Sequence, residues 1–132
     1  MNQILILLFI LLLTKTEAAW NSRHVEIIND LGLKTDLTIH CKSKDDDLGV
    51  HLLRFQESFW INFKLNILGG TLFFCSFQWP GNFHHLDVYN QERDNVPPKK
   101  CRTCSYKIRS DGGHRFNQEF QDFTDFFPWN KE

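Results

Sequence analysis

The chain has 132 residues, of which 42% are hydrophobic and 14% aromatic, and its 15 basic and 16 acidic side chains give a formal net charge of -1. This length and composition suit one packed domain and exclude disorder as the main state. The near-neutral balance provides no broad basic field of the kind that neutralises phosphates. Nucleic acid is therefore not expected as a partner.

The N-terminal segment MNQILILLFILLLTKTEAAW contains an uninterrupted apolar run from Ile4 to Leu13. This run is shorter than the roughly 20 residues that a membrane-spanning helix needs. Thr16 and Ala18 are the small residues that a signal peptidase prefers before its cleavage site. We predict a signal peptide over residues 1–18, a single secreted domain over residues 19–132, and no stable insertion in a membrane. The alternative is an N-terminal anchor that stays attached.

Six segments alternate between apolar and polar residues, a pattern typical of strands that are buried on one face. In chain order they cover residues 25–29, 37–41, 59–65, 71–79, 86–89 and 104–108. The predicted inward residues are Val25, Ile27, Leu37, Ile39, Cys41, Phe59, Ile61, Phe63, Leu65, Phe73, Cys75, Phe77, Trp79, Leu86, Val88, Cys104, Tyr106 and Ile108. Turn signals rich in Gly, Pro, Asn and Asp separate the segments, so an antiparallel sandwich or barrel is predicted.

The C-terminal segment HRFNQEFQDFTDFFPWNK permits two interpretations. Phe116, Phe120, Phe123 and Phe127 recur at helical spacing, which predicts an apolar stripe on a helix. A strand followed by a packed tail is the alternative.

Four cysteines, Cys41, Cys75, Cys101 and Cys104, follow the predicted signal peptide. In a cytosolic protein the CRTC motif would suggest a redox pair, and a second such pair would suggest zinc, but in a secreted protein an even set predicts two structural disulfides. Four cysteines allow three connectivities. We favour Cys41 with Cys104 and Cys75 with Cys101, because three of the four lie on inward faces and can link strands through the core.

The stretch HCKSKDDDLGVHLL places three consecutive aspartates, Asp45, Asp46 and Asp47, between two apolar runs. Carboxylates attract Ca²⁺, but this block lacks the ligand spacing and the distal glutamate of an EF-hand loop. We predict a solvated turn in which an aspartate side chain accepts hydrogen bonds from nearby backbone amides, and no metal site.

Six histidines raise the alternative of a small secreted hydrolase such as an RNase, which would use one imidazole as a base and another as an acid. They are His24, His40, His51, His84, His85 and His114. No local arrangement pairs them, so no catalytic residues are assigned and the protein is not expected to be an enzyme.

Three aromatic residues, Trp60, Phe74 and Tyr89, fall on the reverse faces of amphipathic strands. Exposed aromatic residues are frequent anchors of protein interfaces. The alternative is that both faces of these strands are covered.

The blocks VEIINDLG, LTIHCKSKDDDLG, FWINF, TLFFCSFQWPGNFHHLDVY and CRTCSYKI resemble the plant self-incompatibility protein family, the secreted S-protein homologues. The resemblance runs through nearly the whole predicted mature chain. Two features depart from the family pattern: Tyr106 stands where the family usually has tryptophan, and the phenylalanine-rich C-terminal segment diverges.

This resemblance implies an all-β fold, a small antiparallel β-sandwich of about 7–8 short strands stapled by two disulfides. It also implies an extracellular plant signalling ligand or recognition protein that meets a cell-surface receptor, in settings that include pollen–pistil contact. We expect a monomer without cofactor. Lys44, Asp45, Asp46 and Asp47 form the candidate recognition loop, because loops on a rigid sandwich commonly provide its binding surface. A structural or defence-related wall protein is a further alternative.

Overall fold

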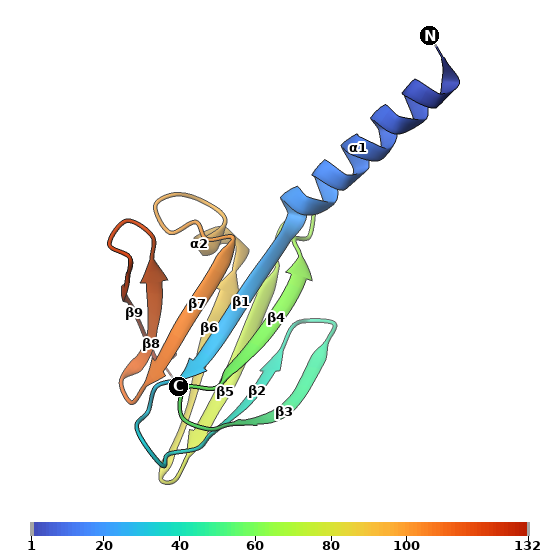
Figure 1. Cartoon of the computed structure of the whole chain (residues 1–132). Coiled ribbons are helices and arrows are strands. Elements are labelled where there is room, and N and C mark those ends of the chain that lie inside the picture. The colour runs from blue at the N-terminus through green and yellow to red at the C-terminus, as the bar shows by residue number, and fades with distance from the viewer. Residues whose placement is uncertain (1, 132) are drawn as a thin grey trace.

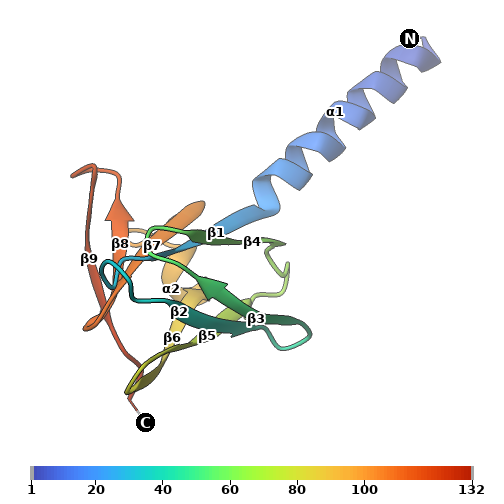
Figure 2. The ribbon, with the colours of Figure 1, turned by 60° about the horizontal axis from the view of Figure 1, so that its bottom comes forward.

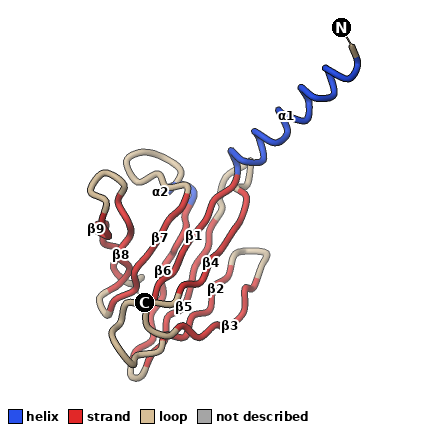
Figure 3. Tube along the Cα trace, viewed as in Figure 1, coloured by secondary structure: helices blue, strands red, loops and turns tan. Residues whose placement is uncertain are grey.

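The computed structural model describes residues 2–131, and the side chains of residues 12–19 lie outside the described part. Two helices and nine strands are found in the described residues (Figures 1 and 3). In chain order they are α1 (Gln3–Asn21), β1 (Ser22–Asn29), β2 (Leu37–Lys42), β3 (Asp47–Leu53), β4 (Ser58–Lys64), β5 (Leu72–Trp79), β6 (Asn82–Asn90), α2 (Gln91–Asp94), β7 (Thr103–Arg109), β8 (Gly112–Asn117) and β9 (Asp122–Pro128).

The strands form two sheets that face each other across a common core (Figure 2). One sheet has the order β4-β1-β7-β8-β9 and the other the order β3-β2-β5-β6. All neighbouring strands are antiparallel except β1 and β7, which run parallel. The β-sandwich is confirmed, with nine strands in the described residues rather than about seven or eight and with one parallel pair.

Strict alternation of side chains places the predicted inward residues in the core. In β1 every second residue is buried, and Val25 and Ile27 are fully enclosed. All other predicted inward residues are also buried, except that Phe59, Phe63 and Trp79 are half-buried and pack against the core from its margin. A period of two in the sequence was therefore a sound guide to which side of each strand faces the opposite sheet.

Tyr89 is a correction to the predicted faces, because it lies in the core and not on the reverse face of its strand. The β5–β6 pairing contains a bulge: Phe73 pairs with Tyr89, whereas the next residue, Phe74, pairs with Asp87. The extra residue on β6 is Val88, and a bulge of this kind breaks the alternation of side chains. Val88 and Tyr89 are consequently both buried.

The predicted disulfide connectivity is wrong. Cys41 is bonded to Cys75, its direct partner on the neighbouring strand, with Cα atoms 4.0 Å apart. Cys101 is bonded to Cys104, only three residues away. Inward orientation was a poor guide to proximity, since Cys104 belongs to the opposite sheet while Cys41 and Cys75 are adjacent within one sheet.

The C-terminal segment forms a hairpin of β8 and β9 and does not form a helix. Phe127 points inward and is buried, Phe116 contacts Phe123 edge to face, and Phe120 lies in the exposed turn. The helical spacing of these phenylalanines was fortuitous, because the turn between the strands and a register shift between Arg115 and Asn117 change which residues share a face.

A buried ionic network fastens α2 to the sandwich. Asp94 is fully buried and accepts hydrogen bonds of 2.7 Å from Arg93 and 2.7 Å from Arg115, which lies on β8. Burial opposes the charge on Arg93, but its hydrogen bond to Asp94 and the charges of Tyr106, Asp94 and Asp87 together outweigh burial and raise the pKa of the guanidinium. Arg93 also reaches the hydroxyl of Tyr106, which donates to the carbonyl of Val88. The network therefore links both sheets at one end of the molecule.

Helix α1 extends away from the sandwich and continues directly into β1 (Figure 1). Its apolar side chains from Ile4 to Leu11 are exposed. The predicted cleavage after Ala18 falls among the residues whose side chains are not described. Within the described residues, no helix combines the length and the apolar character needed to span a membrane.

Candidate recognition groove

The acidic block forms a tight reversal between β2 and β3. The backbone amide of Ser43 donates to the carbonyl of Asp46 at 2.8 Å, and the amide of Asp46 donates to the Ser43 hydroxyl at 3.1 Å. Lys44 and Asp45, at the tip, are exposed. We refer to residues 43–46 as the 43–46 turn.

Asp47 follows this turn and bonds differently from its two neighbours. Its carboxylate accepts a hydrogen bond from the Gly49 amide at 2.9 Å and lies 2.6 Å from the His40 imidazole. The bond from Gly49 and then the contact with His40 hold the pKa of Asp47 below its usual range. The predicted solvated turn, with an aspartate that bonds a backbone amide, is thus present.

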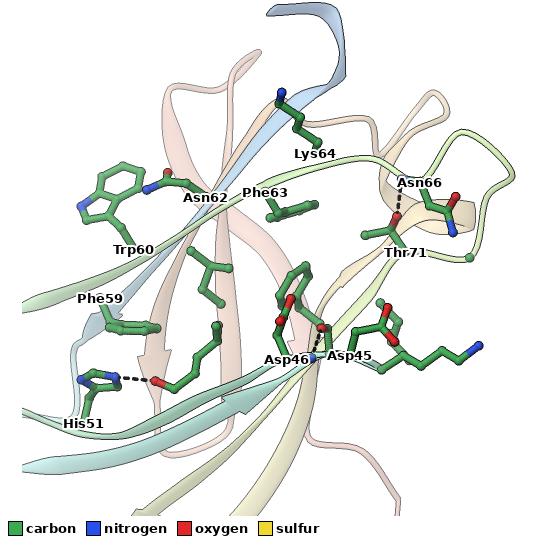
Figure 4. Close-up of a pocket in the computed structure, with 17 residues that line it drawn as sticks. Asp45, Asp46, His51, Phe59, Trp60, Asn62, Phe63, Lys64, Asn66 and Thr71 are labelled. Atoms are coloured by element: carbon green, nitrogen blue, oxygen red, sulfur yellow. Dashed lines mark hydrogen bonds between the residues drawn. The ribbon is translucent and has the colours of Figure 1, made fainter. Parts of the chain in front are cut away.

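A groove of about 730 Å³ lies between β3 and β4, where the two sheets are open at one side (Figure 4). We call it the β3–β4 groove. Four residues of its apolar lining are ones that the alternation pattern assigned to the inward faces: Phe59, Ile61, Phe63 and Phe73. The 43–46 turn contributes Lys44, Asp45 and Asp46 to one wall, whereas Asp47 does not line the groove. The structure therefore places three residues of the candidate recognition loop at the groove and leaves the fourth, Asp47, outside its lining.

Figure 4 shows how the β4 side chains divide between the two sides of the strand. Phe59 and Phe63 point toward β3 and the 43–46 turn, and Trp60 and Lys64 point away. On the β3 side His51 packs on Phe59, with ring centroids 4.3 Å apart, and its Nε2 atom lies 2.8 Å from the Leu48 carbonyl. The apolar lining is thus bordered by polar groups.

A loop with an exposed apolar tip adjoins the end of the groove. Ile67 and Leu68 are 88% and 95% exposed. The base of the loop is fixed, because the Asn66 amide donates to the Thr71 hydroxyl and the Thr71 amide donates to the Gln91 side chain on α2. Two exposed aliphatic side chains on an anchored loop are a typical element of a protein-binding surface.

The carboxylates of Asp45 and Asp46 have no cationic partner within the part of the chain that the structure describes. Lys44 lies beside them in the turn, and Lys64 lines the groove from β4. The two carboxylates are free to attract a cationic group on a partner.

The two other aromatic residues on reverse faces are accessible. Trp60 is 48% exposed at the groove and Phe74 is 36% exposed on β5. Of the three residues considered as interface anchors, Trp60 alone borders the β3–β4 groove, and its indole ring points to the outer face of β4, away from β3. Its wide indole ring makes it the best candidate for an anchor of a partner.

The six histidines have separate surroundings. His24 contacts Asn62, His40 contacts Asp47, His51 packs on Phe59, and His114 contacts Asp111. His84 stacks on Trp129, and His85 packs edge to face on Phe83. Throughout the described part of the chain, no group of three or more His, Cys, Asp or Glu residues could hold a metal ion.

A family model described as plant self-incompatibility protein S1 matches residues 24–129. The chain belongs to this family. S-protein homolog 2 of Arabidopsis thaliana is 47% identical over 113 residues, which cover 84% of this chain and 70% of the relative. S-protein homolog 5 of the same plant is 39% identical over 110 residues, which cover 83% of this chain and 80% of the relative.

A solved structure of self-incompatibility protein homologues has the same fold. It is described as representing a widespread family of small, highly stable, secreted proteins from plants. The TM-score is 0.56 at 21% identity, and the match covers 84% of this chain and 96% of the solved one. Membership of a family of small secreted plant proteins confirms the predicted localisation.

Sequence reasoning missed two parts of the groove. Phe59 and Phe63 were correctly assigned to inward faces, but the pattern did not indicate that they lie at an open margin. Ile67 and Leu68 were not singled out. Their signal was the segment NILGG, in which two aliphatic residues stand within a turn that ends in two glycines with φ of 88° and 83°.

Proposed function

We propose that this protein is a secreted signalling ligand or recognition protein that binds a plant cell-surface receptor through the β3–β4 groove and the 43–46 turn. The main support for this proposal is the composition of the groove. It combines an apolar lining and two carboxylates without ion pairs among the described residues, and an exposed tryptophan lies beside it on the outer face of β4. Such a mixture of apolar anchor and polar rim is typical of protein-binding surfaces.

The proposal includes the state in which the protein acts. Residues 1–18 are removed as a signal peptide, and residues 19–132 act as a monomer in cell–cell recognition, with pollen–pistil contact as one setting. The action is binding without catalysis. Support comes from the family, whose members carry the name of self-incompatibility proteins and not of enzymes, and from the separate surroundings of the six histidines.

The test is saturable binding of the labelled, disulfide-intact protein to intact plant cells, with unlabelled protein as competitor. The intact mass of the secreted protein, measured first, identifies the cleavage site. We expect the double variant Asp45→Asn with Asp46→Asn to bind more weakly. The matched control is Asp47→Asn, which removes a neighbouring carboxylate that does not line the groove and should leave binding unchanged.

Two outcomes would overturn the proposal. Absence of saturable binding to both reproductive and vegetative cells would contradict the existence of a cell-surface receptor. Equal binding by the double variant and the Asp47→Asn control would show that the 43–46 turn is not part of the binding surface. An RNA-cleavage assay of the same preparation tests the hydrolase alternative, which requires activity that His-to-Ala variants lose.

A further inference from the structure

The backbone groups on the outer edge of β4 can be identified from its register with β1. The Leu65 amide donates to the Asn21 carbonyl at 2.9 Å, and the Asn29 amide donates to the Glu57 carbonyl at 3.1 Å. These bonds flank an antiparallel register in which Lys64 pairs with Ser22 and Ser58 with Ile28. The odd-numbered residues of β4 therefore direct their backbone groups toward β1.

Alternate residues of an antiparallel strand direct their N–H and C=O groups to opposite sides. Trp60, Asn62 and Lys64 consequently point these groups away from β1. Because β4 is the last strand of its sheet, no neighbouring strand pairs with them in the described structure. All three residues line the β3–β4 groove. The groove therefore offers a row of unpaired backbone donors and acceptors, which is a template for an added strand.

We propose that the β3–β4 groove binds an extended segment of a partner protein, which pairs with β4 as an additional strand. This inference rests on the proposed function and names the kind of receptor segment that would be recognised. The partner segment has alternating apolar side chains and at least one lysine or arginine. Backbone pairing provides affinity in this mode of binding, and side-chain pockets provide specificity.

The lining of the groove explains the chemistry of that segment. Side chains that face the space between the sheets would meet Phe59, Ile61 and Phe63, so they should be apolar. A basic side chain would meet Asp45 and Asp46 on the opposite wall, which have no ion pair among the described residues. Charge complementarity of this kind mainly selects the partner and speeds its association.

The shape of the groove favours a single segment over a second copy of this chain. The groove is bounded by β4 on one side and by β3 with the 43–46 turn on the other. One strand can enter between two such walls, whereas the edge of a complete sandwich would bring its second sheet against them. Pairing along residues 60–64 needs a segment of about five residues, roughly 17 Å long.

The test begins with a phage-displayed library of random heptapeptides, selected on the disulfide-intact mature protein. We expect the selected peptides to alternate apolar and polar residues and to be enriched in lysine or arginine. Selection on the variant Asp45→Asn with Asp46→Asn should yield the same alternation without the basic preference. Failure to select any alternating sequence on the native protein would overturn the proposal.

A matched pair of variants then tests backbone pairing. Asn62→Pro removes the outward N–H and places a ring at the edge, whereas Asn62→Ala removes the same side chain and keeps the N–H. Both lose the contact with His24. We expect a selected, synthesised peptide to bind Asn62→Pro at least about tenfold more weakly than Asn62→Ala, the loss that corresponds to one backbone hydrogen bond. Equal affinities would overturn the proposal.

Hydrogen exchange provides a second measurement that does not depend on the folding of Asn62→Pro. Bound peptide should slow exchange at the amides of Trp60, Asn62 and Lys64, and N-methylation of the peptide should weaken binding at alternate positions only. Exchange that is unchanged at all three amides would contradict strand addition. A dimer of the native protein that Asn62→Pro separates would show that a second copy takes the place of the partner.

Failure of this inference can be distinguished from failure of the proposed function. If cells bind the native protein saturably and Asn62→Pro binds them as well as Asn62→Ala, the receptor stands and strand addition is wrong. If the peptides bind as expected and cells do not bind the protein, strand addition stands and the receptor is wrong.

Discussion

Two sets of aspartates in this molecule have opposite surroundings. Asp94 is fully buried, and its oxygens accept hydrogen bonds from Arg93, Arg115 and the Asn90 amide. Asp45 and Asp46 are exposed on the wall of a groove, without an ion pair among the described residues. The same kind of side chain therefore stabilises the fold in one place and remains available to a partner in another.

The difference shows how a carboxylate can be assigned to structure or to recognition from its surroundings. A buried charge is tolerated only when its partners compensate for the lost hydration, so its removal leaves those partners uncompensated. An exposed charge keeps its hydration and contributes little to the free energy of unfolding. We expect these two sites to respond very differently to matched changes.

The largest expected effect on stability comes from Asp94→Asn. This substitution keeps the shape of the side chain but leaves Arg115, whose side chain is 3% exposed, without its carboxylate. We expect the free energy of unfolding to fall by about 3–5 kcal/mol, the usual cost of breaking a buried ion pair. Denaturant unfolding at neutral pH measures this loss.

The control for Asp94→Asn is the double variant Asp45→Asn with Asp46→Asn. Surface substitutions of this kind usually change stability by at most about 0.5 kcal/mol. If the double variant destabilised the protein as strongly as Asp94→Asn, the 43–46 turn would be a structural element and the comparison would fail.

The two disulfides should also differ. The Cys41–Cys75 bond joins residues 34 apart and holds β2, which leads into the 43–46 turn, to β5, whereas the Cys101–Cys104 bond joins residues 3 apart. On the chain-entropy model, removal of the Cys41–Cys75 bond lowers the free energy of unfolding by about 4 kcal/mol, and removal of the Cys101–Cys104 bond lowers it by about 1.5 kcal/mol. Paired Cys-to-Ala variants, compared by thermal unfolding, measure both values. An equal loss in the two variants would contradict the difference in loop length.

A smaller, pH-dependent effect is expected from the two tyrosines, which are the only ones in the chain. Burial raises the pKa of Tyr106 to about 12, with the charge of Asp94 as a further cause, and burial also raises the pKa of Tyr89. Because both pKa values are raised on folding, this contribution to stability is complete below about pH 10 and is lost as the pH rises toward 12.

Ultraviolet absorbance of phenolate measures this effect directly. The native protein should show little ionised tyrosine at pH 10, where the denatured protein is about half ionised. Titration of the protein denatured in guanidinium is the control. A native curve that coincides with the denatured one would show that neither tyrosine is buried as described.

The alternation of apolar residues was enough to predict most of the core, because in a strand every second side chain points to the same face. It failed at Tyr89, where a bulge between β5 and β6 interrupts the alternation. At the C-terminal phenylalanines the sequence left a helix and a strand both open, because their spacing matched a helix although the chain reverses between β8 and β9. Both places depend on pairing with another strand, which a local pattern does not record.

The candidate site was predicted only in part. The exposure of Lys44, Asp45 and Asp46 followed from their position in a turn, and their place beside Phe59, Phe63 and Trp60 did not. Those aromatic residues come from β4, which belongs to the other sheet. Asp47 differs from its neighbours because β2 brings His40 within 2.6 Å of its carboxylate.

The amino-acid sequence by itself determined the class of fold, the family and the separation of inward from outward residues, because alternation and turn chemistry act over a few residues. Only the tertiary structure decided the partner of each cysteine, the enclosure of Asp94 between two arginines and the opening of a groove along β4. These features depend on which strands are neighbours and where a sheet ends, and both are decided by contacts between residues far apart in the chain.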